Sequence, residues 1–373
     1  MKKNLFKRRI VALLGAAVIF AEMTAYAPLT AYDVSAASDI IAQGNEDNTG
    51  SSCWVLDRSG TLTVRRNIDI YSKFMIRDYR EYVKKIVVEE GVTLLPSMFF
   101  SQCTNLEEVI LPDSLLTIEN SCFESCGSLR KIDLPKNLEV IGKDVFSGCG
   151  SLEKINISKE NKFFCSDNGV LFDKNMKTLL VMPSAKTGDY TVPAGTVTIS
   201  ETAFYEHSLS SVTIPESVTV IENVSDINSE KLKKIIVSKD NKYFCSVDGV
   251  LFDKNMKTLL VMPSAKTGDY TVPAGTVKIS ETAFYEHSLS SVAIPKSVTV
   301  IENVNDFNSF YSEKLKKITV DKSNKKYSSK NGVLFDKAQK TLLCFPPAVT
   351  GTYTIPASVT AIGIMYPRNK TGD

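Results

Sequence analysis

Histidine and tryptophan are almost absent from this chain of 373 residues, which contains two histidines and one tryptophan. The histidines, His207 and His287, occupy the same position of two internal copies, in the sequence Ala-Phe-Tyr-Glu-His-Ser. A Ser–His or Cys–His catalytic pair needs one histidine in a unique environment. We therefore expect no catalytic site and no enzyme, and we place both histidines at the surface or at an edge of the fold.

Long apolar runs and an excess of one charge are also missing once the start of the chain is set aside. Residues 1–37 have a basic beginning, an apolar stretch at 10–20 and small residues at 34–36, a pattern typical of a secretory signal peptide. An uncleaved membrane anchor is the alternative. No later segment reaches 18 apolar residues, so we expect no transmembrane segment after removal of the signal. The remaining 39 basic and 40 acidic residues nearly balance, which disfavours nucleic acid and anionic membranes as partners.

The eight cysteines do not show the spacing of a metal site. Cys103, Cys126 and Cys149 recur every 23 residues, whereas metal ligands converge in pairs two to four residues apart. We interpret them as buried thiols that act as small hydrophobic groups. Cys122 and Cys126, four residues apart, leave a metal or a disulfide as an alternative. We expect no metal and no cofactor, and we interpret the recurring aspartates as turn residues rather than calcium ligands: Asp173, Asp253 and Asp336.

Two nearly identical segments dominate the sequence. Residues 169–208 and 249–288 differ at a single position, where Thr198 corresponds to Lys278, and a third, degraded copy begins at Leu315. Tandem copies display the same surface several times, whereas an enzyme needs different residues that converge on one site. The duplication therefore favours a binding or structural role.

A shorter period of 23 residues lies within residues 83–151, with the frame L-x-x-I-x-[IVL]-P-x-x-[VL]-x-x-I-x-x-x-[AVC]-F-x-x-C. Apolar residues at alternate positions before the proline predict a short strand with one buried face, and the proline ends it. The rest of the unit predicts an irregular or short helical arm. One unit cannot bury its own apolar side, so neighbouring units must stack into a solenoid.

This frame resembles the BspA-like leucine-rich repeats of bacterial secreted and surface proteins, most plainly at residues 106–128, 129–151, 209–231 and from 289 onward. The resemblance covers roughly residues 53–363 and implies a leucine-rich-repeat fold. It implies recognition of extracellular proteins, with adhesion to host proteins as the usual role, and no catalytic residues.

The predicted organisation has five parts. Residues 1–37 are the signal peptide, 38–52 a disordered linker, 53–82 a β-rich N-terminal cap, 83–363 the solenoid and 364–373 a tail. The solenoid is a mainly β rod of about eleven coils with 80-residue super-repeats from 152, 232 and 315. In each super-repeat an Asn-Gly or Asp-Gly pair predicts a type I′ turn, so we expect an inserted β-meander that projects from the coil.

The strand positions that point away from the core carry the candidate ligand-binding face. They form a spaced basic row that suits an acidic segment of a protein ligand, although a solvated face kept soluble by lysine is the alternative: Arg130, Lys131, Lys154, Lys233, Lys234, Lys316 and Lys317. We expect a secreted or non-covalently attached cell-surface scaffold that binds an extracellular protein or glycoprotein. A passive spacer, or the binding part of a secreted hydrolase, is the alternative function.

Overall fold

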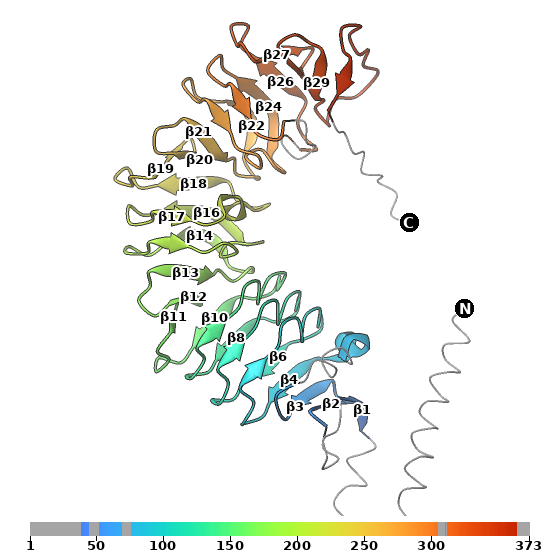
Figure 1. Cartoon of the computed structure of the whole chain (residues 1–373), viewed down its shortest axis with the longest axis vertical. Coiled ribbons are helices and arrows are strands. Elements are labelled where there is room, and N and C mark those ends of the chain that lie inside the picture. The colour runs from blue at the N-terminus through green and yellow to red at the C-terminus, as the bar shows by residue number, and fades with distance from the viewer. Residues whose placement is uncertain (1–38, 45–51, 69–75, 305–309, 311, 364–373) are drawn as a thin grey trace, which may run out of the picture. The chain divides into compact units, whose positions relative to one another are not determined.

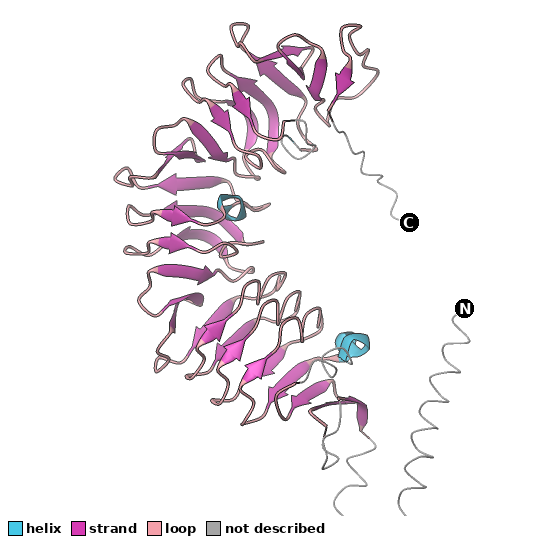
Figure 2. Ribbon diagram, in the orientation of Figure 1, coloured by secondary structure: helices cyan, strands magenta, loops and turns pink. Residues whose placement is uncertain are grey.

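The computed structural model describes residues 39–44, 52–68, 76–304, 310 and 312–363. The chain divides into two compact units, residues 1–41 and 42–373, and the second unit contains the repeats. The regular elements of the described residues are mostly strands, with short 3-10 helices at η1 (Ile76–Tyr82) and η2 (Val224–Ile227) (Figures 1 and 2). The predicted signal peptide and tail lie outside the described residues. The predicted linker is described only in part, and there the expectation of disorder is wrong because residues 40–43 form strand β1 (Ile40–Gln43).

The predicted cap is a hairpin that begins the parallel sheet. Strands β2 (Trp54–Asp57) and β3 (Thr61–Val64) pair antiparallel, and the side chain of Asp57 accepts hydrogen bonds from the backbone N–H groups of Ser59 and Thr61 in the turn. The Trp54 side chain is fully buried. Strand β3 pairs parallel with β4 (Lys85–Val88), so the hairpin occupies the edge that the first coil would otherwise expose.

Each 23-residue coil contributes strands to two parallel ladders. The ladder of L-x-x-I strands follows the coils as two hydrogen-bonded pairs, β4 with β6 (Glu108–Ile110) and β8 (Lys131–Leu134) with β10 (Lys154–Ile157). The second ladder contains β5 (Leu94–Leu95), β7 (Thr117–Ile118) and β9 (Val140–Ile141). Residues 23 apart are register partners in both, such as Lys131 with Lys154. The solenoid predicted from the period is therefore confirmed.

The arms between these ladders are turns, and they are linked from coil to coil. The Phe100 N–H donates to the Cys122 carbonyl at 3.0 Å, and the Phe123 N–H donates to the Val145 carbonyl at 3.0 Å. The ring of Phe123 stacks between those of Phe100 and Phe146, with centroids 5.2 and 5.9 Å away. These repeated contacts let each arm cover the core of its own coil and of its neighbour.

Each super-repeat contains a three-stranded antiparallel meander. The strands are β11 (Phe164–Asp167), β12 (Val170–Asp173) and β13 (Thr178–Val181), then β19 (Phe244–Val247), β20 (Val250–Asp253) and β21 (Thr258–Val261), then β27 (Tyr327–Lys330), β28 (Val333–Asp336) and β29 (Thr341–Cys344). At the first turn Asn168 and Gly169 have φ of 50° and 82°. Positive φ at both central residues is the type I′ geometry that the sequence predicts.

The meanders do not project from the coil, contrary to expectation. The third strand of each joins the second ladder: β13 pairs parallel with β15 (Thr198–Ile199), which pairs with β17 (Val220–Ile221). In the next copies β21 pairs with β23 (Lys278–Ile279) and β25 (Val300–Ile301), and β29 with β30 (Ala361–Ile362). Three consecutive residues of the middle strand, Val170, Leu171 and Phe172, are fully buried. A strand covered on both faces must lie inside the fold.

The L-x-x-I ladder continues through the super-repeats as β14 (Thr187–Thr191), β16 (Ser208–Ile214) and β18 (Lys234–Val237), and as β22 (Thr267–Thr271), β24 (Ser288–Ile294) and β26 (Lys317–Val320). The described residues form about 13 turns of the solenoid, against the eleven expected. The core repeats with the chain, because Phe204 and Phe284 occupy equivalent places in two hydrophobic clusters.

Candidate functional site

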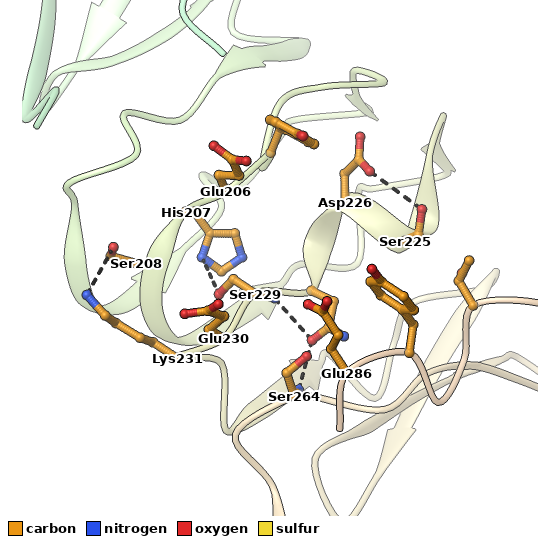
Figure 3. Close-up of a pocket in the computed structure, with 14 residues that line it drawn as sticks. Glu206, His207, Ser208, Ser225, Asp226, Ser229, Glu230, Lys231, Ser264 and Glu286 are labelled. Atoms are coloured by element: carbon orange, nitrogen blue, oxygen red, sulfur yellow. Dashed lines mark hydrogen bonds between the residues drawn. The ribbon is translucent and has the colours of Figure 1, made fainter. Parts of the chain in front are cut away.

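A cleft of about 680 Å³ lies between two copies of the super-repeat (Figure 3). One side is formed by residues 205–208 of the first copy. The other includes Thr282, Tyr285 and Glu286, and the two tyrosine–glutamate pairs are equivalent positions 80 residues apart. The rest of the lining comes from Ser264, from η2 and from the residues that follow it. The duplication thus places the same pair on both sides of one concave surface.

Helix η2 replaces the plain arm in this coil and brings Asp226 to the cleft. The helix begins after Asn223, whose side-chain oxygen accepts hydrogen bonds from the Ser225 N–H at 3.3 Å and the Ser225 hydroxyl at 2.6 Å. An asparagine at this position satisfies donors that the first turn of a helix leaves unpaired. After the helix, the Asn228 side chain accepts a hydrogen bond from the Ser264 N–H at 2.9 Å.

The two histidines are buried, so the expectation of a surface or edge position is wrong. His207 and His287 are each 2% exposed. The Nδ1 of His207 accepts the Leu209 N–H at 3.1 Å, its Nε2 lies 2.8 Å from the Ile227 carbonyl, and its ring packs edge-on against Phe204. A ring that accepts at Nδ1 donates at Nε2, so this histidine is neutral. Burial lowers the pKa of His207 to about 4.

Carboxylates outnumber cations along the cleft. Among the described residues, those that line it include Glu206, Asp226, Glu230 and Glu286, together with one lysine, Lys231. The ion pairs between described residues involve side chains that do not line the cleft, such as Lys143 and Glu201 at 2.7 Å. Burial raises the pKa of Asp226 to about 6, with further contributions from the negative charges of Glu201 and Asp144. The cleft therefore has a negative field that its own residues do not neutralise.

All seven residues of the predicted ligand-binding face are exposed, but they do not form one continuous row. Lys131 and Lys154 are neighbours on paired strands. Lys234 lies beside Ser211 and Lys317 beside Ser291, so serine coils interrupt the row. Acidic groups also neutralise part of it, since Arg130 lies 3.6 Å from Glu153 and Lys131 lies 3.8 Å from Asp133. Binding of an acidic ligand at this face stays a prediction.

The meander turns pack onto three of these lysines, a contact that strand alternation alone does not predict. A Cβ atom added at Gly169 would lie 3.1 Å from the Cα of Lys154, and one added at Gly249 would lie 2.8 Å from the Cβ of Lys234. Gly332 approaches Lys317 in the same way. The turn therefore requires glycine for two reasons: its backbone has a positive φ, and the lysine lies too close for a side chain.

The cysteines and aspartates singled out from the sequence have structural places. Cys103, Cys126 and Cys149 are fully buried, and the Cys126 and Cys149 thiols donate to carbonyl groups of the preceding coil. Burial raises the pKa of Cys103 to about 12. The Asp173 carboxylate accepts the Thr178 N–H at 2.8 Å, as a turn residue does, and the other two repeated aspartates make the same contact. Within the described ranges no group of three potential ligands is arranged to hold a metal ion.

Sequence reasoning missed the cleft, although its signal was present. The sequence Ala-Phe-Tyr-Glu-His-Ser occurs in both copies, and its tyrosine and glutamate can bind a ligand as well as its histidine can. The exposed members are Tyr205, which is 43% exposed, and the glutamate that follows it. The described part of the chain contains no helix with the length and apolar character needed to span a membrane.

Comparison with known proteins identifies the repeat family. The profile of the BspA type leucine rich repeat region matches residues 78–187, 181–257 and 263–339, with 6 copies. No curated protein matches the chain. Solved structures that it resembles include a leucine rich cell surface protein from Faecalibacterium prausnitzii, with 19% identity, 75% of this chain and 95% of the other covered, and a TM-score of 0.46. A leucine-rich repeat protein from Eubacterium ventriosum has 18% identity, coverage of 83% and 82%, and a TM-score of 0.36. The pneumococcal vaccine antigen PcpA has 19% identity, coverage of 75% and 70%, and a TM-score of 0.37. Because the family profile covers more than half of the sequence, the chain belongs to the BspA type leucine rich repeat family.

Proposed function

We propose that this protein is a secreted or cell-surface scaffold that adheres to host or other extracellular proteins through its repeated surfaces. Membership of a repeat family of protein-interaction scaffolds, which are typically not enzymes, supports this role. The basic start and apolar stretch of residues 1–20 support export. Attachment to a cell surface is non-covalent in this proposal.

The observation that carries the proposal is the repetition of exposed side chains at one spacing. Phe163 and Tyr243 occupy equivalent positions 80 residues apart and are 46% and 53% exposed. The tyrosine–glutamate pairs of the cleft repeat at the same interval. Several weak contacts at a fixed spacing raise the affinity for a multivalent ligand by about a hundredfold or more, provided that the contacts engage together.

The test uses surface plasmon resonance to measure the binding of purified residues 38–373 to immobilised extracellular-matrix proteins, plasma proteins and mucin. We expect saturable binding to at least one of them, and a salt titration shows how much of the affinity comes from charge. A folded, monodisperse sample that binds none of these ligands would contradict adhesion and favour the passive spacer. Cell fractionation and N-terminal sequencing of the exported protein test the location and the predicted cleavage of the signal.

A further inference from the structure

The cleft between the two copies has features that select one kind of ligand. Its lining includes four carboxylates and one lysine, and the Lys231 ammonium group lies 3.4 Å from the Ser208 hydroxyl. Asp226 is half-buried and has no lysine or arginine partner among the described residues. A carboxylate that is partly removed from water without a counter-ion is stabilised by a cation that enters beside it.

Tyrosines flank this negative surface on both sides. Tyr205 belongs to the first copy and Tyr285 to the second, and each is followed by a glutamate. An arginine side chain suits such a pair because its guanidinium group stacks on the aromatic ring and donates two parallel hydrogen bonds to the carboxylate. Lysine, a compact point charge, offers only part of this set of contacts.

Hydrogen bonds inside the fold hold the cleft in place. His207 links the first side to the end of η2 through the Ile227 carbonyl at 2.8 Å. Its Nδ1 also lies 3.3 Å from the Ser229 hydroxyl (Figure 3). The Asn228 contact with Ser264 links the residues after η2 to the second copy. Because the positions of these elements are fixed before binding, a ligand loses less free energy in ordering them.

We propose that this cleft binds an extended, arginine-rich segment of the partner protein, with its guanidinium groups against the two tyrosine–glutamate pairs and Asp226. This inference rests on the proposed function and specifies the chemistry of the partner at one surface. The volume of about 680 Å³ accommodates a few side chains of an extended peptide, in the range usual for ligand sites. The charge of the cleft is opposite to that of the lysine face, so the two surfaces are separable by experiment.

The experiment measures binding of fluorescein-labelled hexa-arginine, hexalysine and hexaglutamate to residues 38–373 by fluorescence anisotropy. The cleft variant combines Glu206→Gln with Glu286→Gln, and Asp226→Asn is a second variant. The control removes the same number of charges at two exposed glutamates outside the cleft, Glu139→Gln with Glu160→Gln. All variants are compared by circular dichroism to verify that they fold.

We expect hexa-arginine to bind more tightly than hexalysine, and hexaglutamate not to bind at the cleft. The double glutamate variant should weaken hexa-arginine binding about three- to tenfold, whereas the control should change it less than twofold. Equal losses in the cleft variant and the control would overturn the proposal, because they would show attraction by net charge alone. Absence of hexa-arginine binding would also overturn it.

The same samples are tested against the immobilised extracellular proteins, which separates this inference from the proposed function. If an extracellular protein binds and the cleft variant binds it as well as the unchanged protein does, the cleft inference fails and the scaffold role stands. If the cleft variant loses both hexa-arginine and the protein ligand, both proposals are supported. If hexa-arginine binds the cleft and no extracellular protein does, the adhesion proposal fails for those ligands and the cation site stands.

Discussion

Replacement of Asn241 by alanine should loosen the start of the second meander, at residues 243 and 244. The Asn241 side chain is fully buried and makes four hydrogen bonds. It donates to the carbonyls of Pro215 and Val218 at 2.9 and 2.8 Å, and it accepts the N–H groups of Tyr243 and Phe244 at 2.9 and 2.8 Å. It therefore joins the start of the meander to the preceding coil.

The magnitude follows from what the alanine leaves behind. Each net hydrogen bond contributes about 0.5–1.5 kcal/mol, and a buried group left without a partner costs about 1–3 kcal/mol. Because water enters once this surface segment loosens, we expect a loss of about 3–5 kcal/mol in the local free energy of opening rather than the full sum. Asn241→Asp should be at least as harmful, because an ionised carboxylate cannot donate to the two carbonyl groups.

Amide hydrogen exchange measured by mass spectrometry is the suitable assay, because it reports the opening of each part of a solenoid separately. Exchange in β19, residues 244–247, should become faster by about a hundredfold or more. The equivalent strand β11 keeps its own asparagine, Asn161, and serves as a control within the same molecule. The exposed Asn255→Ala is the control for substitution itself. Equal protection of β19 in Asn241→Ala and Asn255→Ala would refute the reasoning.

Three further predictions concern the buried and turn residues. The His207 pKa is lowered from 6.5 to about 4, so the stability that its neutral form contributes is present above pH 6.5 and is lost as the pH falls through 4. Between these pH values the free energy of unfolding in urea should fall by about 2–3 kcal/mol more in the unchanged protein than in the His207→Leu variant. The Cys126 thiol is buried and its pKa is raised well above 9.0 by burial, so DTNB should label it only after denaturant is added. Cys165, Cys245 and Cys344 are only partly buried, so the labelled residue is identified by peptide mapping, and rapid labelling of Cys126 itself in the native protein would contradict its place in the core. Gly249→Ala should lower the free energy of unfolding by about 2 kcal/mol or more, because the new methyl group clashes with Lys234 and the backbone keeps a strained positive φ. Gly268 has a similar φ but faces open space, so Gly268→Ala should lower the thermal unfolding temperature less.

Removal of the charge of the half-buried Asp226 should stabilise the protein at neutral pH, in contrast to the substitutions above. Its pKa is raised from 3.8 to about 6, so the folded state binds the proton more tightly and the resulting stability is lost as the pH rises from about 4 through 6. After a discount for partial exposure to solvent, Asp226→Asn should stabilise the protein by about 1 kcal/mol at pH 7 and have little effect at pH 4. A variant less stable than the parent at pH 7, by chemical denaturation, would contradict this account of the cleft.

Periodicity predicted the solenoid because apolar positions such as Leu129, Ile132 and Phe146 must be buried by their neighbours, whatever the details of the arms. The type I′ turns were predictable because few residue pairs accept positive φ at both positions. The path of the meander was not, because Val170, Leu171 and Phe172 form a short apolar run whose burial depends on tertiary neighbours.

The candidate site was harder to predict than the fold. The duplication of His207 without a partner motif predicts a place at the surface or at an edge, yet two backbone groups satisfy its ring in the core. The cleft depends on residues 80 positions apart, such as Glu206 and Glu286, and on the place of η2 between the copies. No local pattern encodes that proximity. The exposure of the lysine positions was predictable from strand alternation, and their part in binding stays a prediction.

The measurement that tests recognition through repeated surfaces most directly is the dissociation rate of a protein ligand from a variant that lacks residues 152–231. The deletion joins Ser151 to Leu232, which stands where Leu152 does in the intact chain, and it keeps the register because Asn241 contacts residues 26 and 23 positions before it, as Asn161 does. If the repeated surfaces act together, the ligand should dissociate about tenfold faster or more from the shortened, folded solenoid. An unchanged dissociation rate would contradict the account, because it would place binding at a single site that the repeats do not share.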